Sequence, residues 1–570
     1  MSIKATVTKE MDKNESYVIQ KAYDVHEGQY GKWERKGDAL VFVPKGSAVY
    51  ISRIINRIDT GEKFLDLFFY DAQGCKVELT LPRKELTEQG IMVLLGFGVQ
   101  ILKQETKVLI SSIMNQEPNA PCVLQHNTLG FSEYDGHKIF LAQKSIGVES
   151  VYSGTLQIGE TGSYEKWENM VKEEVIGNIP LEFMLAVAGS GILVDYLREK
   201  VQVDNVIVSI VGESSTGKST AGLFLVSCGA KPTFQGDSFA FNFADTQNAL
   251  LSSIPSSYPT LIDEGSLCNS NPTKFIYSLK SGNEKKRKDR EGKNTFNTSI
   301  VFTSEKSVLN LSDENTGLLV RVLEIENVVW TQNAQSADSI KNTIYNNYGW
   351  LIPKLAEEIL KFEENGEDEI YTVYKDWHDH LVERAKDQGN YNGFTDRACK
   401  QYALIMLSAS LIQRVMGIEL NEDGIVEFIE EHSPVKDMDK MDIGSRALIY
   451  LKQYITKYYS QFVLPDDDSS YAPQKCLGRI GNKGLSIMKN GASYKKCLYM
   501  ADVTLENILR EGRFPDKKVI LKKWKESGIL KCEKDRYLSD IVITGNLSVK
   551  GYIINLPDME EKMVGDLRKE

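Results

Sequence analysis

The residues whose types and spacing most clearly imply chemistry lie between Gly212 and Ser219, in the run GESSTGKS, which fits the pattern G-x-x-x-x-G-K-[ST]. The apolar run VIVSIV precedes this loop, and a helical pattern follows it. Glycines let backbone N–H groups converge on phosphate oxygens, and the following helix adds the positive end of its dipole. The pattern predicts a phosphate-binding loop, and the alternative is an ordinary glycine-rich turn.

In such a loop Lys218 reaches the β- and γ-phosphates of ATP, and the hydroxyl of Ser219 coordinates Mg²⁺. The residues of the loop expected to bind ATP are Gly212, Glu213, Ser214, Ser215, Thr216, Gly217, Lys218, Ser219 and Thr220.

Hydrolysis also needs acidic residues, and the run YPTLIDEGS supplies two at the end of an apolar stretch. Asp263 can hold the water shell of Mg²⁺, while Glu264 can polarise the attacking water. A kinase acting on a small metabolite has less use for the second acid. The alternative is a strand end that carries two surface acids.

Two further residues are candidates for contacts with the γ-phosphate. The strand-like run TSIVFTSEKS offers Thr303, or failing it Ser304, although hydroxyls often merely finish strands. Arg321 opens another strand in NTGLLVRVLEIE and is a candidate arginine finger for the site of a neighbouring subunit. Its alternative is a surface or salt-bridged arginine.

A charged segment lies between the acidic pair and the Thr303 strand. Residues 284–293 hold six basic and three acidic side chains, and their strand-like flanks make a β-hairpin plausible. We hypothesise that the tip grips a nucleic-acid backbone without reading sequence, inside a central pore. The alternative is a charged disordered loop. The residues proposed to bind DNA are Lys285, Lys286, Arg287 and Lys288.

The composition of the whole chain indicates the class of protein in which these motifs occur. The chain has 570 residues, 42% hydrophobic and 26% charged, which predicts a soluble protein of several domains. The eight cysteines are scattered without a CxxC pair, so they favour reduced thiols over a zinc site. The N-terminus lacks a signal peptide, which predicts a cytoplasmic protein. The apolar stretch from Phe183 to Val194 is shorter than the roughly 18 residues of a membrane span.

The C-terminal region differs from the rest in charge. The whole chain carries −11, yet residues 475–556 hold 17 Lys and Arg against 8 Asp and Glu. Two amphipathic helical patterns followed by two short apolar runs predict a winged helix, whose second helix would meet DNA phosphates. Many winged helices bind proteins instead. The lysines on or beside the second helix are Lys517, Lys518, Lys522, Lys523 and Lys525, of which Lys522 and Lys523 are the main DNA-binding candidates.

The order of these parts resembles AAA+ ATPases with a presensor hairpin, the group containing minichromosome-maintenance (MCM) and superfamily III helicases. More closely, the chain is similar to a family of mobile-element ATPases first catalogued as a domain of unknown function. Its relatives include MCM-like replicative helicases of staphylococcal cassette chromosomes. The resemblance is specific from about residue 178 to residue 417. It rests on SIVGESSTGKST, LIDEGS, LKSGNEKKRKDREGK, FTSEKS, GLLVRV and TDRACKQYALIMLSASL.

The resemblance implies site roles that agree with those above, with Arg321 as the finger. It adds Arg397, at the start of the DRACKQYALIMLSAS helix, as the sensor 2 residue that contacts ATP. The alternative for Arg397 is a solvent-facing arginine, since an N-terminal arginine gains nothing from the helix dipole. The MCM pattern has an asparagine as sensor 1, whereas this strand offers only Thr303 and Ser304.

The resulting expectation is a multidomain α/β fold, in which an AAA+ P-loop ATPase core with a helical lid follows a β-rich N-terminal region and precedes a C-terminal winged helix. The predicted divisions are a β-rich N-terminal domain (1–110), a β-rich connecting region (111–177), the ATPase core (178–345), the lid (346–462), a linker (463–474) and the winged helix (475–570).

The implied function is an ATP-driven ring helicase, a homo-oligomer and by resemblance a hexamer, that replicates a mobile genetic element by moving on single-stranded DNA and unwinding forked duplex. Element-encoded replication proteins are candidate partners. One alternative is a DNA-binding ATP switch, an initiator or loader without processive unwinding. Another is a metabolite kinase, whose turnover would ignore DNA. A primase is disfavoured, because the β-rich N-terminal region shows no convincing metal-binding acids or cysteines.

Overall fold

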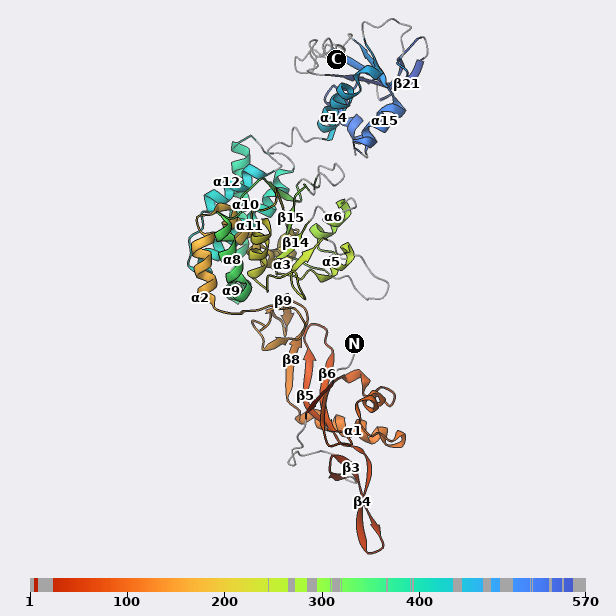
Figure 1. Cartoon of the computed structure of the whole chain (residues 1–570), viewed down its shortest axis with the longest axis vertical. Helices are drawn as coiled ribbons and strands as arrows, with labels where there is room; N and C mark the ends of the chain where they lie inside the picture. Colours follow the sequence, from red (N-terminus) through yellow and green to blue (C-terminus); the bar gives the residue numbers. More distant parts are fainter. Residues whose placement is uncertain are drawn as a thin grey trace.

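The protein is elongated, and Figure 1 shows its parts following one another along the long axis, with an N-terminal part, an α/β core and a C-terminal domain. The computed structural model describes residues 5–8, 24–243, 246–264, 272–283, 295–307, 309, 318, 320–364, 368–389, 391, 394–433, 443–464, 473–481, 496–512, 514, 516–532, 536–545 and 548–556.

The N-terminal part is built on a six-stranded mixed sheet in the order β1-β7-β6-β5-β8-β11. Alternate residues of β6 and β7 are buried under helix α1 (Thr106–Gln116) and a 3₁₀ segment (Gly90–Phe97), as the period of two in a strand requires. The strands are β1 (Ala5–Thr8), β5 (Val49–Arg57), β6 (Lys63–Tyr70), β7 (Lys76–Pro82), β8 (Cys122–His126) and β11 (Ser150–Tyr152).

Two smaller sheets accompany this one. The first is a three-stranded antiparallel sheet whose long β3–β4 hairpin forms the end of the molecule farthest from the C-terminal domain (Figure 1). The second is a hairpin that lies beside the α/β core. The strands are β2 (Asp24–His26), β3 (Gln29–Lys36), β4 (Ala39–Ser47), β9 (Gly130–Tyr134) and β10 (His137–Leu141).

The predicted division at residue 110 is wrong, because it falls inside α1. Strand β8, from the predicted connecting region, pairs in parallel with β5 of the predicted N-terminal domain. A single sheet therefore spans both regions. The sequence showed strand-like runs on each side of residue 110, but it held no local signal for a pairing between strands more than 60 residues apart.

The α/β core contains a five-stranded sheet in the order β13-β14-β15-β12-β16, with every pair parallel. These strands are buried on both faces, which explains why their sequences are continuous apolar runs. The alternation of strand-like and helical runs between residues 205 and 325 is typical of such a parallel sheet covered by helices. The strands are β12 (Val206–Val211), β13 (Ala240–Asn242), β14 (Thr260–Asp263), β15 (Ser299–Ser304) and β16 (Leu323–Glu326).

Helices cover both faces of this sheet. Helices α3 (Ile179–Val201) and α4 (Lys218–Ser227) contribute to one apolar cluster, and α5 (Gln247–Ser253) and α6 (Thr273–Ser281) contribute to the other. Strand β12 joins the two clusters, since Val206 and Val208 belong to the first and Ile207 to the second. A short helix, α2 (Tyr164–Met170), and a π-helical turn (Val171–Val175) precede α3.

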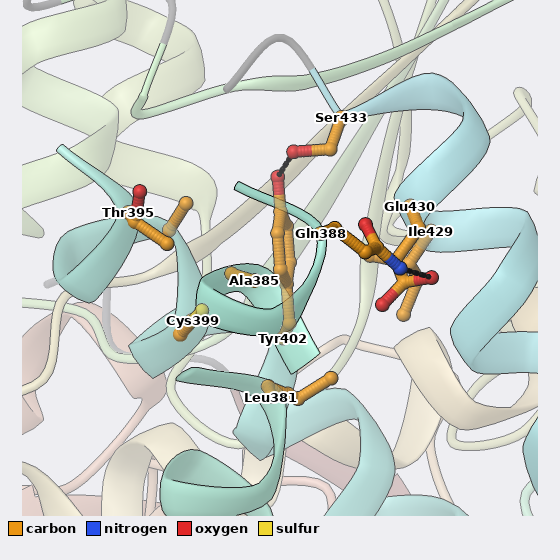
Figure 2. Close-up of a pocket in the computed structure, with 10 residues that line it drawn as sticks. Leu381, Ala385, Gln388, Thr395, Cys399, Tyr402, Ile429, Glu430 and Ser433 are labelled. Atoms are coloured by element: carbon orange, nitrogen blue, oxygen red, sulfur yellow. Dashed lines mark hydrogen bonds between the residues drawn. The ribbon is translucent and has the colours of Figure 1, made fainter. Parts of the chain in front are cut away.

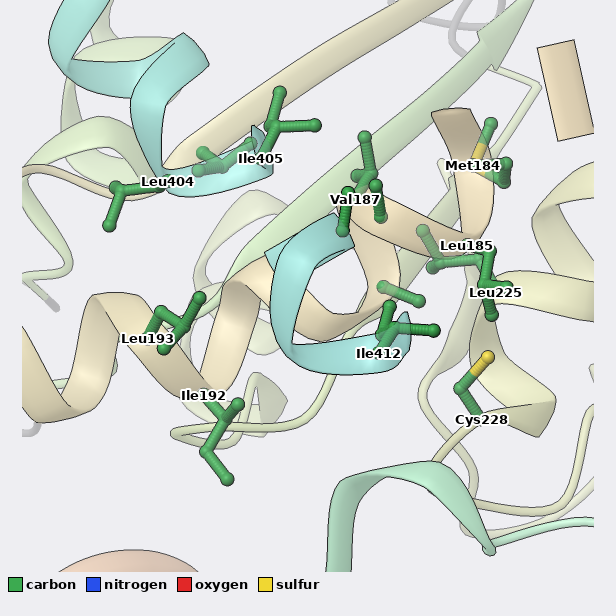
Figure 3. Close-up of a cluster of buried hydrophobic side chains, with 14 of the residues drawn as sticks. Met184, Leu185, Val187, Ile192, Leu193, Leu225, Cys228, Leu404, Ile405 and Ile412 are labelled. Atoms are coloured by element: carbon green, nitrogen blue, oxygen red, sulfur yellow. The ribbon is translucent and has the colours of Figure 1, made fainter. Parts of the chain in front are cut away.

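Helix α3 is the centre of the larger cluster. It has 23 residues, which is longer than the apolar stretch seen in the sequence, and it is apolar enough to cross a membrane. However, 83% of its most apolar window is buried inside the protein, as in a core helix. Figure 3 shows Leu185, Val187 and Leu193 of α3 packed with side chains of α4 and of a later helix, α11.

A helical region follows the sheet and packs on α3 through the same apolar cluster. Two of its helices, α9 (Leu351–Glu364) and α11 (Thr395–Met416), coincide with helical patterns in the sequence (residues 345–365 and 396–416). The helices are α8 (Ala334–Asn346), α9 (Leu351–Glu364), α10 (Glu369–Asp387), α11 (Thr395–Met416) and α12 (Glu422–His432).

The C-terminal domain has a separate apolar core that contains the fully buried Trp524. The indole N–H of Trp524 donates to the carbonyl of Gly444 at 2.6 Å, which ties the third helix of the domain to the first. Its elements are α14 (Ile443–Lys457), β17 (Phe462–Val463), β18 (Gly478–Gly481), β19 (Cys497–Ala501), α15 (Asp502–Glu511), α16 (Lys517–Glu526), β20 (Ser539–Val542) and β21 (Ser548–Asn555).

The predicted start of this domain at residue 475 is wrong. Helix α14, which falls within the predicted lid (346–462), packs in the C-terminal core through Leu448 and Leu451. The predicted linker (463–474) begins inside β17, which pairs with β18. Its residues 465–472 lie outside the described part of the chain. An amphipathic helix shows which of its faces is buried, but its sequence does not show which neighbour covers that face.

Candidate functional site

The loop between β12 and α4 has the backbone geometry of a close-fitting turn. Gly217 has φ of 87°, and a Cβ added there would lie 2.7 Å from the hydroxyl oxygen of Thr331. The carbonyl of Thr216 accepts a hydrogen bond from the backbone N–H of Trp330 at 2.9 Å. The loop is therefore held from behind by the segment that follows β16, and glycine is required at position 217.

The ends of three parallel strands open onto one hollow beside this loop. Because β15 lies between β12 and β14, the residues that end these strands lie side by side. The carboxyl end of a parallel sheet is where ligands of such folds bind. The hollow has a volume of about 470 Å³ and is lined by Ser214, Ser215, Gly217, Lys218, Ser219, Thr220, Asp263, Glu264, Thr303, Ser304, Glu305 and Lys341.

Lys218 lies folded against the loop. Its Nζ donates to the carbonyls of Gly212 at 2.8 Å and Glu213 at 2.5 Å. Burial lowers the pKa of Lys218, and the nearby carboxylates of Glu305 and Asp263 oppose that shift. The ammonium group is thus kept at the mouth of the loop, where a phosphate oxygen can replace the two carbonyl oxygens as its acceptor.

Asp263 and Glu264 are both hydrogen-bonded to the hydroxyl of Thr303. Thr303 Oγ1 donates to Asp263 Oδ1, and it accepts a hydrogen bond from the backbone N–H of Glu264 at 3.4 Å. Ser304, the other candidate on this strand, instead donates to the carbonyl of Lys306 at 2.5 Å. Of the two hydroxyls weighed from the sequence, Thr303 is the one bonded to the acidic pair.

The carboxylate of Glu264 has a further partner that sequence reasoning missed. Asn242, the last residue of β13, donates from Nδ2 to Glu264 Oε2 at 3.2 Å. Glu264 itself has φ of 58°, an uncommon value for a residue with a side chain. Asn242 was missed because the short strand β13 was not recognised in the sequence and its place beside β14 depends on strand order.

Two more residues of the hollow were also missed. Glu305 accepts a hydrogen bond from Ser214 Oγ at 2.5 Å, which joins the strand end to the loop. Lys341, on α8, adds a second positive charge to the wall of the hollow. Lys341 lies more than 120 residues along the chain from the loop, and no motif marked it.

The residues present fit a magnesium ion. Ser219 and Asp263 line the same hollow and offer oxygen atoms, the ligands that Mg²⁺ prefers. Within the described residues no group of three or more His, Cys, Asp and Glu could hold an ion by itself. This donor set suits an ion that takes its remaining ligands from phosphate oxygens and water.

The two arginines predicted at the ATP site lie away from the hollow of their own chain. The guanidinium of Arg321 lies 4.8 Å above the ring centre of Tyr277, on α6. Arg397 is exposed in the first turn of α11. Neither arginine lines the hollow. A role for either one therefore depends on a neighbouring subunit or on a movement of the helical region.

The charged tip residues Lys285, Lys286, Arg287 and Lys288 lie outside the described residues, so the hairpin stays a prediction. The described residues on the two sides of this segment nevertheless lie next to each other. Helix α6 ends at Ser281 with Gly282 as its C-cap, and Asn283 pairs with Thr295 in an antiparallel bridge. The chain thus leaves α6 and returns to the core at one place.

The basic helix of the C-terminal domain divides into two sets of lysines. Lys522 and Lys523 are exposed on α16, as a DNA-contacting surface requires. Lys517 instead bonds to Asp502 at 2.9 Å and to Glu506 at 2.6 Å, within the domain. The expectation that Lys517 helps to present charge to DNA is therefore not met, since two carboxylates already neutralise it.

A second pocket lies between α10, α11 and α12 (Figure 2). Tyr402 and Ser433 share a hydrogen bond of 2.9 Å at one side, and Gln388 donates to Glu430 at 3.0 Å at another. Its volume is about 50 Å³. That is room for one or two water molecules, given that a liquid water occupies about 30 Å³, so the pocket is too small for a nucleotide.

Two family models match the chain. Residues 28–297 match a domain of unknown function, DUF927, and residues 442–559 match the Cch helix turn helix domain. The second match begins one residue before α14, in agreement with the domain boundary in the structure. The search of curated proteins gives no match.

Among solved structures, the chain is similar to one titled "SCCmec type IV Cch - active helicase". The TM-score is 0.74 at 20% identity, and the match covers 95% of this chain and 98% of that one. The apo C-terminal region of NrS-1 matches with a TM-score of 0.25 at 12% identity, over 66% of this chain and 90% of that one, which is too weak to support an argument.

These findings confirm the resemblance inferred from the motifs. The chain has the multidomain α/β fold of the Cch structure along nearly its whole length. It also carries a helix-turn-helix domain at its C-terminus, where the sequence predicted a winged helix.

Proposed function

We propose that this protein is an ATP-driven, ring-shaped DNA helicase of the AAA+ MCM-like type that replicates a mobile genetic element. The observation that carries the proposal is the hollow in which the loop lysine, two adjacent carboxylates and a strand-end hydroxyl converge, in a chain with the fold of the Cch structure. In this proposal Lys218, Asp263, Glu264 and Thr303 serve hydrolysis of the γ-phosphate of ATP.

Each residue has a defined task in the proposed reaction. The N–H groups of the loop and Lys218 bind the phosphates. Bound Mg²⁺ supplies charge neutralisation at the phosphates, and the oxygens of Ser219 and Asp263 would hold it. Glu264 orients the attacking water and accepts its proton. The bond from Asn242 and the contact with Thr303 fix the position of Glu264.

The position of Arg321 supports the proposed ring. A finger must stand beside the γ-phosphate in the transition state, whereas Arg321 lies over Tyr277, away from its own hollow. We therefore assign it to the site of the next subunit. Such a head-to-tail contact closes into a ring when the rotation between subunits is right, and the resemblance to MCM helicases suggests six subunits.

DNA contacts in this proposal come from two places. The charged segment between Gly282 and Thr295 would track the backbone of a single strand, because phosphate contacts need no base reading. The exposed lysines of α16 would hold duplex DNA beside the ring. Binding should weaken steeply with salt, since each neutralised phosphate releases counterions.

Strand displacement from a forked duplex, with ATP as the only nucleotide, tests the proposal. The helicase predicts displacement together with DNA-stimulated hydrolysis. Hydrolysis that responds to DNA without displacement would instead establish the switch, an initiator or loader, for which the helix-turn-helix domain is equally suited. A rate of ATP hydrolysis that does not change when DNA is added would refute both the helicase and the switch.

A further inference from the structure

A fully buried lysine lies where three parts of the core meet. Lys280 stands near the end of α6, and only 7% of its surface is exposed. Its Nζ donates to the carbonyl of Asn205 at 2.6 Å and to the side-chain oxygen of Gln401. Asn205 directly precedes β12, which leads to the phosphate loop, and Gln401 belongs to α11.

The partners of Lys280 are themselves fixed. The side chain of Asn205 donates to the carbonyl of Leu279 at 2.7 Å and accepts from the backbone N–H of Thr298 at 3.0 Å. Gln401 donates to the carbonyl of Ile207, within β12, at 3.3 Å. The network therefore joins α6, the start of β12 and α11 through buried hydrogen bonds.

This position matters because of what each element carries. Helix α6 ends one residue after Lys280, at the place where the charged segment leaves the core. Helix α11 carries Arg397 one turn before Gln401. One ammonium group thus connects the helix of the predicted sensor to the base of the segment proposed to bind DNA.

A contribution to the stability of the fold does not explain why a lysine occupies this buried position. Both acceptors are uncharged, and burying an ammonium group without a paired carboxylate is costly. Burial accordingly lowers the pKa of Lys280 to about 7. A methionine would fill similar space without a charge, so the lysine is better explained by the three-way connection that only a long side chain with several donors can make.

We propose that Lys280 is a positioning residue that links α11 to the end of α6, so that a shift of α11 on ATP binding moves the C-terminal end of α6. The link rests on the proposed function, since it connects the ATP site with the DNA-binding segment. Its physical basis is a direct network of hydrogen bonds between the two elements, which double-mutant analysis can test.

The first test compares Lys280→Met and Gln401→Leu with the intact protein. The measured quantities are the KM for ATP, the rate of hydrolysis without DNA and the fold stimulation by single-stranded DNA. We expect an unchanged KM and a stimulation that falls toward one in both variants. Lys274→Met is the matched control, because it removes a lysine from the exposed face of the same helix, and it should keep full stimulation.

The double variant Lys280→Met/Gln401→Leu should behave as either single variant does, because both changes break one link. Full stimulation in the folded single variants, or additive losses in the double variant, would overturn the proposal. If Lys280→Met does not fold, the result for Gln401→Leu alone tests the proposal, because that variant keeps the hydrogen bond from Lys280 to the carbonyl of Asn205.

Hydrogen exchange separates this inference from the proposed function. Amide exchange in residues 273–283 is measured with and without a slowly hydrolysed ATP analogue, in the absence of DNA. We expect a nucleotide-dependent change in the intact protein that Gln401→Leu abolishes. No change in the intact protein, or the same change in the variant, contradicts the link. A further outcome is a rate of ATP hydrolysis that is the same with and without DNA, together with the expected exchange result. In that case the helicase proposal is wrong and the proposed link through Lys280 is still supported.

Discussion

Thr303 bonds to both members of the acidic pair, since its hydroxyl donates to the carboxylate of Asp263 and accepts from the backbone N–H of Glu264. The residue that the sequence predicted to contact the γ-phosphate thus also bonds to both of the acidic residues. The hydroxyl is buried, with 2% of the residue exposed, so water does not easily replace it.

Replacing Thr303 by valine should therefore slow hydrolysis without preventing ATP binding. We expect kcat to fall about tenfold or more, as a positioned acid or base contributes about 10²-fold to 10⁴-fold in all. Thr303→Ser keeps the hydroxyl and should retain most of the activity. Steady-state kinetics and ATP affinity check this, and equal kcat values for the valine and serine variants would contradict it.

Subunit mixing tests the assignment of Arg321. The variants Arg321→Ala and Lys218→Ala should each be inactive alone, the first lacking the finger and the second the phosphate-binding lysine. Mixed oligomers contain interfaces where an intact Lys218 meets an intact Arg321 of the neighbour. Hydrolysis should therefore partly return on mixing. A mixture as inactive as its components would place Arg321 outside the neighbouring site.

The sequence predicted the parts of the site that are local in the chain. The run from Gly212 to Ser219 forms the loop, and Asp263 ends its strand beside it, because a strand followed by a turn specifies its own geometry. Thr303 was also identified. Asn242 and Lys341 were missed because their places depend on strand order and on how α8 packs, and neither property leaves a local pattern.

The same distinction explains the errors in domain division. The predicted lid (346–462) included residues 443–457, because the sequence could not show that Leu448 of α14 belongs to the same apolar core as Trp524. Likewise, the sequence of β8 has a strand-like pattern whichever sheet the strand joins. The domain to which α14 and β8 each belong is determined by contacts with segments distant in the chain.

The crossing of α3 and α11 allows a test of packing. A Cβ at Gly189 would lie 2.3 Å from the hydroxyl of Ser408, and that hydroxyl has no hydrogen-bond partner among the described residues. Gly189→Ala should destabilise the core by about 1–3 kcal/mol through overpacking. Adding Ser408→Ala should recover part of the loss. Thermal unfolding measures both, and an additive loss in the double variant would contradict the proposed contact.

The stability contributed by Lys280 should depend on pH. Burial lowers its pKa from 10.5 to about 7; Asp204 opposes the shift, while Arg321 and Arg198 add to it. Between these pH values the unfolded chain binds more protons than the folded one, so stability rises with pH. Relative to Lys280→Met, the protein should gain stability from about pH 7 to about pH 10 and show no trend at lower pH.

Urea unfolding of the two proteins across this range checks the prediction, with Lys274→Met as the control for loss of an exposed lysine. Parallel stability curves for the intact protein and Lys280→Met would show that Lys280 does not change its protonation on folding.

The most direct test of the central claim is the variant Glu264→Gln, with the exposed Glu199→Gln as its matched control. ATP hydrolysis with and without single-stranded DNA is measured in the same reactions as unwinding of a forked duplex. A helicase driven by this site predicts DNA-stimulated hydrolysis and strand separation in the intact protein and the control, with both lost in Glu264→Gln. Undiminished hydrolysis or unwinding in Glu264→Gln would contradict the account.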